Sequence, residues 1–226
     1  MTDATTSQNA KNPSWPGGKP IAVLVSILFE TWSDGKAPSY FPRTTPLKSG
    51  TADRGAIQWA QYGGNEGLWR ILRTLDRHSV PATIFCSGRC GELYPQVIAA
   101  AAKAGHDIAG HGYTQDGLFC YMTREEERDA IRKTLDALER ACGIRAQGWA
   151  TPAYSWTEHT FDLLRAEGVT LVRRRARHRP AAQAGHRERR HRRVSLERFR
   201  RQPRAARGAP QLPRGLPRHL RVSARA

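Results

Sequence analysis

The sequence is short of cysteine and has no long hydrophobic run. Its four cysteines in 226 residues make no disulfide framework, and Cys86 and Cys90 form a lone C-x3-C pair. Without a second pair, two small half-buried core residues are favoured over a zinc site. The first 20 residues lack the apolar stretch of a secretory signal, and no later segment approaches the ~18 apolar residues of a membrane span. We therefore expect a cytoplasmic protein.

Acidic residues are nearly absent from the last quarter of the chain. Residues 173–226 contain 19 arginines but only Glu188 and Glu197 as acids, which accounts for the whole formal charge of +17. Residues 1–172 are therefore neutral overall. The basic charge of the chain gives no indication of a nucleic-acid-binding surface in these residues. The tail also lacks lysine, tryptophan, tyrosine, isoleucine and methionine. It cannot bury enough apolar surface to offset the entropy of ordering its backbone, so we expect it to be disordered.

Two explanations fit the arginine-rich composition of residues 173–226. One is a tail that binds RNA, DNA or an anionic surface, because arginine pairs well with phosphate. The other is an out-of-frame translation of GC-rich DNA, in which the natural C-terminal part is lost. The absence of lysine and the abrupt change of composition after the apolar segment VTLV favour the second. The predicted organisation is a flexible N-terminus over 1–17, an α/β domain over 18–172 and the tail over 173–226.

Between these ends, apolar runs alternate with helical patterns. The run KPIAVLVSILFE is typical of a strand buried on both faces, and the Pro- and Gly-rich segment 31–50 after it is predicted to be a long loop, which is often functional. Further strands are predicted at 80–88, 106–112, 144–150 and 169–172. Helices are predicted at 65–78 (N-cap Asn65), 94–105, 123–143 (capping box Thr123 and Glu126) and 155–168 (capping by Ser155 and Glu158). This order argues for a parallel α/β sheet or barrel.

Polar and aromatic residues gather where the predicted strands end. Glu30 ends the first strand, and His111 lies at the end of the third in the segment GHGYTQD. Gln115 stands four residues after His111, where a second histidine could complete a metal site. The segment WATPAY, 149–154, ends the fourth strand. Because the carboxyl ends of parallel strands meet at one edge, we expect these clusters to share a site.

Four segments together resemble the polysaccharide deacetylase superfamily, carbohydrate esterase family 4. They are ILFETWSDGKAPSY, QYGGNEGLWRILRTLDRHSVPATIF, GHDIAGHGYTQD and GWATPAYSWTEHTFDLLRAEG. The resemblance covers roughly 18–172 and is greatest to the cytoplasmic branch that includes allantoinase-like hydrolases. It implies a distorted (β/α)7 barrel and hydrolysis of a C–N amide bond, usually that of an N-acetyl group on an amino sugar. For this chain the expected fold class is α/β, an incomplete distorted (β/α)7 TIM-like barrel with a disordered Arg-rich C-terminal tail.

The chain departs from the metal site that the resemblance implies. The family holds a divalent metal with one carboxylate and a His-x3-His pair, while a second carboxylate is the base and a histidine near the C-terminus is the acid. Here Glu30 replaces the paired aspartates, Gln115 replaces the second histidine, and Ala150 stands where an arginine is usual. An amide oxygen is a poor zinc ligand in place of an imidazole. We expect Glu30 and His111 to bind a divalent metal such as zinc weakly or not at all. A site without a cofactor is favoured over a zinc site.

The predicted roles follow from these departures. Glu30 and His111 are the expected catalytic pair, with Glu30 as metal ligand or general base and His111 as metal ligand or as donor to the substrate carbonyl. Gln115 is expected to bind substrate. An aromatic substrate wall and ordinary packing at the rim are equally plausible for Trp149, Pro152 and Tyr154. Trp32 and Tyr40 lie in the long loop, which forms either a lid or a plain connection.

The predicted function is hydrolysis of a non-peptide C–N amide bond in carbohydrate or small cyclic-amide metabolism, impaired by the loss of the C-terminal part. The expected partner is a small molecule or an amino sugar, and the oligomeric state is open. Two alternatives come from other classes: a catalytically inactive fragment, or a binder of nucleic acid or an anionic surface through the tail.

Overall fold

The structure is a computed structural model that describes residues 21–42, 45–175 and 194–196. Its centre is one sheet with the strand order β1-β2-β3-β4-β5-β6. The strands are β1 (Ser26–Phe29), β2 (Thr83–Cys86), β3 (Asp107–Gly110), β4 (Gly148–Trp149), β5 (Leu171–Arg175) and β6 (Val194–Leu196). Neighbours from β1 to β5 are parallel, and β6 is antiparallel to β5. The prediction of a parallel α/β sheet is confirmed, and the incomplete barrel stays a prediction.

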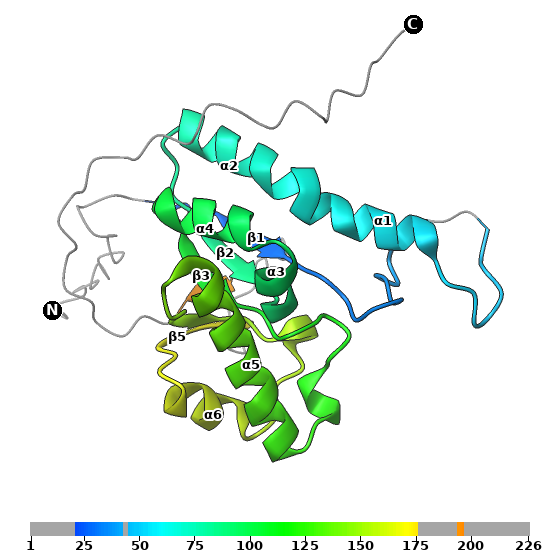
Figure 1. Cartoon of the computed structure of the whole chain (residues 1–226). Coiled ribbons are helices and arrows are strands. Elements are labelled where there is room, and N and C mark those ends of the chain that lie inside the picture. The colour runs from blue at the N-terminus through cyan, green and yellow to red at the C-terminus, as the bar shows by residue number, and fades with distance from the viewer. Residues whose placement is uncertain (1–20, 43–44, 176–193, 197–226) are drawn as a thin grey trace, which may run out of the picture.

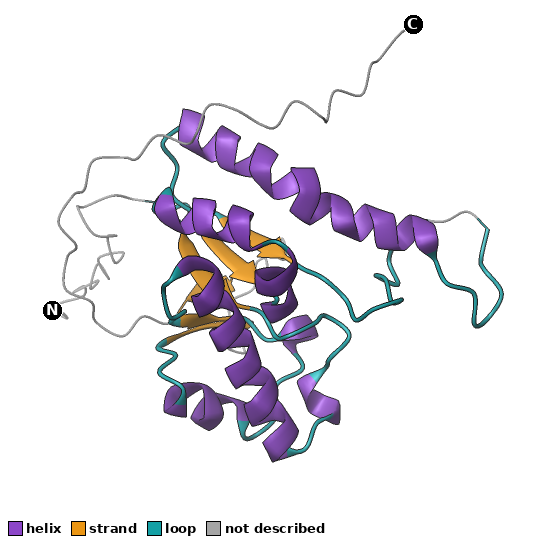
Figure 2. Ribbon diagram, in the orientation of Figure 1, coloured by secondary structure: helices purple, strands orange, loops and turns teal. Residues whose placement is uncertain are grey.

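Helices connect the parallel strands and pack in front of and around them (Figure 2). The α-helices are α1 (Arg54–Tyr62), α2 (Leu68–Arg77), α3 (Gly88–Leu93), α4 (Pro95–Lys103), α5 (Arg124–Cys142) and α6 (Thr160–Ala166). Short turns of other helix types are η1 (Gly63–Gly67), η2 (Phe119–Tyr121) and η3 (Pro152–Tyr154). No helix among the described residues is both long and apolar enough to cross a membrane.

The core lies between the sheet and the helices. The large apolar side chains that are fully buried come from strands β2 and β4 and from helices α2, α4, α5 and α6. They include Ile84, Trp149, Leu72, Ile98, Leu135, Leu138 and Leu164. Cys86 and Cys90 are core residues as predicted, but they are fully buried rather than half-buried. Burial raises the pKa of the Cys86 thiol, so the thiol stays neutral in the core.

The longest helix, α5, begins and ends as its sequence predicts. The Thr123 hydroxyl accepts a hydrogen bond from the Glu126 N–H, and the Glu126 carboxylate accepts one from the Thr123 N–H at 2.8 Å. Gly143 ends the helix with φ of +70°, a conformation that glycine adopts without steric cost. The capping box predicted at Thr123 and Glu126 is therefore confirmed.

Two predicted helix starts are wrong. Asn65 caps no helix, because α1, η1 and α2 form one continuous helical rod that begins after Asp53, whose carboxylate accepts from the Ala56 N–H at 2.9 Å. Figure 1 shows the α1 end of this rod projecting beyond the sheet. The Ser155 hydroxyl, predicted to cap α6, instead accepts from the Phe119 N–H and donates to the Pro152 carbonyl.

A buried carboxylate of α5 organises the start of α6 in place of that cap. Glu127 is fully buried and accepts hydrogen bonds from the hydroxyls of Thr157, at 2.6 Å, and Thr160. The first residues of α6 are thereby tied to α5.

Most of the arginine-rich tail lies outside the described residues. Residues 173–175 are part of β5 and 194–196 form β6, so the regular structure extends past the boundary predicted at 172. The predictions of disorder, of an out-of-frame origin and of nucleic-acid binding fall mainly on 176–193 and 197–226, which the structure does not describe.

A matched pair of glycine substitutions tests this packing. A Cβ added at Gly110, at the end of β3, would lie 2.4 Å from the Trp149 ring. Gly110→Ala should therefore lower the free energy of unfolding by about 1–3 kcal/mol. Gly63 has helical dihedral angles, and its added Cβ would meet nothing closer than 3.9 Å. Gly63→Ala should raise the free energy of unfolding by about 0.5–1 kcal/mol. Urea denaturation measures both, and equal stabilities for the two variants would contradict the described contact.

Candidate active site

The register of the sheet brings Glu30 and His111 to the same level. Phe29 of β1 pairs with Cys86 of β2, which pairs with Gly110 of β3. Each strand therefore continues directly into a polar residue at the carboxyl edge of the sheet: Glu30, Ser87 and His111, in spatial order. His111 is 5% exposed, and the side chain of Glu30 is 22% exposed. The prediction that separate strands deliver Glu30 and His111 to one rim agrees with these positions.

The two side chains are in direct contact. Nε2 of His111 lies 3.1 Å from Oε1 of Glu30, and Nδ1 of His111 lies 2.7 Å from the carbonyl oxygen of Ala150. A carbonyl oxygen only accepts hydrogen bonds, so Nδ1 carries a proton. The contact between Nε2 and a carboxylate oxygen then requires one further proton, held by either the imidazolium or the carboxyl group. The geometry thus allows one proton to pass between two groups that can each accept it.

Tyr40 supports Glu30 from the long loop after β1. Its hydroxyl donates to Oε2 of Glu30 at 3.3 Å. Burial, the negative charge of Glu30 and this hydrogen bond together raise the pKa of Tyr40 to about 12. The phenol therefore stays protonated and remains a donor near neutral pH. Whether the loop acts as a lid stays a prediction.

Gln115 joins the loop of His111 to its neighbours. Its side-chain nitrogen donates to the Ser87 hydroxyl at 3.1 Å and to the His111 carbonyl at 3.0 Å. Its backbone N–H donates to the Thr31 carbonyl, next to Glu30. Gln115 therefore braces the strand ends that carry both catalytic candidates, and its contact with a substrate stays a prediction.

Asp116 fastens the loop after β1 to the loop after β3. Its carboxylate accepts from the Ser33 N–H at 2.9 Å and lies 3.4 Å from the Lys36 ammonium. Arg89 of α3 adds an ion pair to Asp34 of the same loop. Burial acts to raise the pKa of Asp116, but hydrogen bonds from Ser33 and Thr114 outweigh it, and the pKa lies below its usual value.

The residues predicted as a substrate wall are not grouped together. Trp149 is fully buried on the helix side of the sheet, with its ring centroid 6.0 Å from that of Phe119, so its prediction as a wall residue is wrong. Pro152 is buried against Gly112 and supports the loop of His111. Tyr154 is 43% exposed and contacts Trp156 edge to face. Ala153 and Tyr154 both have positive φ, a strained turn of the kind that often marks functional sites.

The three-ligand metal site that the resemblance implies does not fit the residues present. Within the described ranges, no group of three or more His, Cys, Asp or Glu side chains is placed to hold a metal ion. Nε2 of His111 is in hydrogen-bond contact with Oε1 of Glu30. The side-chain nitrogen of Gln115 donates hydrogen bonds to the Ser87 hydroxyl and the His111 carbonyl. The geometry supplies an acid–base pair, and we derive no step through a metal.

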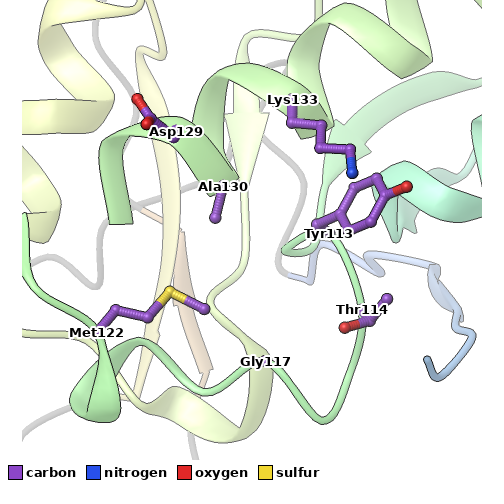
Figure 3. A pocket seen from close by; sticks show the side chains of 7 residues that line it. All are labelled: Tyr113, Thr114, Gly117, Met122, Asp129, Ala130 and Lys133. Atoms are coloured by element: carbon purple, nitrogen blue, oxygen red, sulfur yellow. The ribbon is translucent and has the colours of Figure 1, made fainter. Parts of the chain in front are cut away.

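A cavity of about 220 Å³ lies beside the loop that follows His111. Figure 3 shows its lining, which joins this loop to α5: Tyr113, Thr114, Gly117, Met122, Asp129, Ala130 and Lys133. The Lys133 ammonium lies 3.7 Å from the centroid of the Tyr113 ring, so a cation–π contact closes one side. Neither Glu30 nor His111 lines this cavity.

Comparison with known proteins identifies the family. The family model for polysaccharide deacetylase matches residues 51–172. The chain belongs to the polysaccharide deacetylase family. It is 26% identical to the peptidoglycan deacetylase of Helicobacter pylori over 47% of this chain and 36% of that protein. It is 35% identical to the peptidoglycan-N-acetylglucosamine deacetylase of Bacillus cereus over 38% of this chain and 30% of that protein.

The fold is also similar to that of a solved allantoinase. The Puue allantoinase structure matches with a TM-score of 0.59 and 26% identity, over 74% of this chain and 59% of that one. The chain spans less than half the length of the curated relatives that it matches first.

Sequence reasoning missed two residues of this site, Ser87 and Asp116, and the contact of Tyr40 with Glu30. Ser87 follows an apolar strand as Glu30 and His111 do, so the rule that polar strand ends gather at one edge could have found it. Asp116 and Tyr40 lie in loops whose conformation depends on tertiary contacts.

The lowered pKa of Asp116 predicts a pH-dependent contribution to stability. A group with a lowered pKa stabilises the fold above its unfolded value, which for aspartate is about 3.9, and this stabilisation is lost as pH falls through the folded value. Wild type should therefore be more stable than Asp116→Asn at pH 7, and the difference should shrink below about pH 4. Thermal unfolding from pH 7 to pH 2.5 measures it, with Asp129→Asn on the exposed face of α5 as the charge control. A wild-type advantage that grows with falling pH would contradict the assignment.

Proposed function

We propose that this chain hydrolyses a non-peptide C–N amide bond with Glu30 and His111 as the catalytic pair. The observation that carries the proposal is their 3.1 Å contact, which places a carboxylate beside an imidazole at the carboxyl edge of a parallel sheet. Membership of the polysaccharide deacetylase family supports the same reaction type.

The proton inventory of the pair suits hydrolysis. In the imidazolium–carboxylate form, Glu30 accepts a proton from water as the water oxygen attacks the amide carbonyl carbon. The Nε2 proton of His111 passes to the leaving nitrogen as the C–N bond breaks, which yields a carboxylic acid and an amine. The pair ends with its proton on Glu30, and transfer across the 3.1 Å contact restores the starting form. The Nδ1–H bond to Ala150 keeps the ring orientation throughout.

Two substrate classes follow from the family. Relatives named peptidoglycan deacetylase and chitooligosaccharide deacetylase support an N-acetylated amino sugar. The allantoinase neighbour and the lack of a fitted metal-ligand set among the described residues support a small cyclic amide hydrolysed without metal. We favour the metal-independent reaction, because the pair at Glu30 and His111 needs no third ligand to complete its proton transfers.

Substitution of the pair tests the proposed function. Glu30→Gln and His111→Asn should each lower kcat/KM by about 10²–10⁴-fold, because each removes one proton-transfer group. The assays are acetate release from N-acetylglucosamine oligomers and ring opening of allantoin, each with and without a chelator. Glu158→Gln, at an 85% exposed side chain, is the matched control and should match wild type.

Full activity of both pair variants on the substrate that wild type turns over would overturn the proposal. Activity that disappears with chelator and returns with zinc would overturn the metal-independent form of it.

A further inference from the structure

A connected row of aromatic rings runs outward from the catalytic pair. The ring centroid of Tyr40 lies 6.1 Å from that of Trp32 and 6.1 Å from that of Trp59, and the Phe41 ring lies 5.9 Å from Trp59. Trp59 belongs to α1, and the other three belong to the loop after β1. We call these four residues the aromatic cluster. Since Tyr40 also donates to Glu30, the cluster begins at the carboxylate itself.

The aromatic cluster is not part of the hydrophobic core. Tyr40 is 61% exposed and Trp59 is 48% exposed. Only Ala56 of α1 is buried, so this helix contributes little to the packing of the sheet. Figure 1 shows α1 at the projecting end of the helical rod. Large aromatic surfaces held open beside polar groups are typical of ligand sites rather than of plain connections.

The angles between the rings limit what the cluster can bind. Adjacent ring planes meet at 67° for Trp32 and Tyr40, 82° for Tyr40 and Trp59, and 61° for Phe41 and Trp59. A row of coplanar rings would offer a flat strip to a polymer. Rings that meet at 61° to 82° instead form a corner, which can contact one small ring on its face and on its edge.

A hollow beside the cluster has a matching size. It measures about 390 Å³ and lies between the loop after β1 and the start of α1, with Lys36, Pro38, Phe41 and Asp53 in its lining. Phe41 is the member of the cluster that lines this hollow, and its ring contacts Trp59. Pockets for small molecules begin near 300 Å³, so this volume suits a ligand of one ring.

We propose that the aromatic cluster is a specificity subsite that holds a single ring of the substrate, with the scissile amide of that ring at Glu30 and His111. The inference rests on the proposed function and narrows its substrate class to single-ring amides rather than long glycan chains. Trp59 and Trp32 pack against the ring. Tyr40 is a positioning residue, because its ring belongs to the corner while its hydroxyl orients Glu30.

Steady-state kinetics of the full chain test the subsite. The probes are two single-ring amides, allantoin and N-acetylglucosamine, and one polymer, chitohexaose. Wild type should have a higher kcat/KM on one of the single-ring probes than on chitohexaose. Trp59→Ala should raise KM for that probe about tenfold with little change in kcat, which corresponds to the loss of one aromatic contact. Trp59→Phe should recover most of the loss. Tyr62→Ala is the control, since it removes a 46% exposed ring from the same helix outside the cluster.

Tyr40→Phe separates the two roles of its residue. It keeps the ring and removes the hydrogen bond to Glu30, so kcat should fall several-fold while KM stays unchanged.

Several results would overturn the subsite while leaving the proposed function intact. They are a preference for chitohexaose, an unchanged KM in Trp59→Ala, or a Trp59→Ala variant that changes the oligomeric state by light scattering at constant KM. The last result would mean that the cluster binds a second copy of the chain. If one of these results is found and Glu30→Gln is also inactive, the catalytic role of Glu30 is supported and the subsite is rejected.

Discussion

The contact between Glu30 and His111 depends on one constraint, the register of three parallel strands. Phe29, Cys86 and Gly110 are aligned across β1, β2 and β3, so the next residue of each strand reaches the carboxyl edge at the same height. A slip of one residue in any pair would turn one side chain to the opposite face of the sheet. The backbone bonds from Ser87 to Phe29 and from His111 to Cys86 hold this alignment one residue beyond the strands.

The loops around the pair extend the same alignment. Gln115 and Asp116, which are adjacent in sequence, each bind the segment 31–33, so the loop of Glu30 and the loop of His111 form one connected unit. Ser87 lies between them and accepts from Gln115. A site built from several short polar contacts holds two side chains within proton-transfer distance without a metal to organise them. The departures of this chain from the family's usual ligand set are consistent with such a site.

The sequence predicted those parts of the fold that local patterns specify. The capping box of α5 and the alternation of parallel strands with helices depend on short segments, and both are confirmed. Helix α1 was missed because only Ala56 of it is buried, so no apolar period marks it. For Trp149, whose segment ends a strand, a substrate wall and ordinary packing were equally plausible from the sequence, and the structure shows packing in the core. Trp149 pairs in register with Gly110, so both residues face the helix side of the sheet. The residues that follow them, Ala150 and His111, reach the site. The contact of Tyr40 with Glu30 depends on the folding of a loop that Asp116 and Arg89 hold in place, which no local pattern encodes.

The protonation of His111 is the most direct test of this account. Nitrogen-15 NMR of the imidazole distinguishes a protonated ring nitrogen from a bare one. The hydrogen bond to the Ala150 carbonyl predicts a protonated Nδ1 in the folded protein, and the contact with Glu30 predicts an Nε2 signal that changes in Glu30→Gln. A bare Nδ1 in the folded protein, or an Nε2 signal that is the same in wild type and Glu30→Gln, would contradict the shared proton on which the proposed chemistry depends.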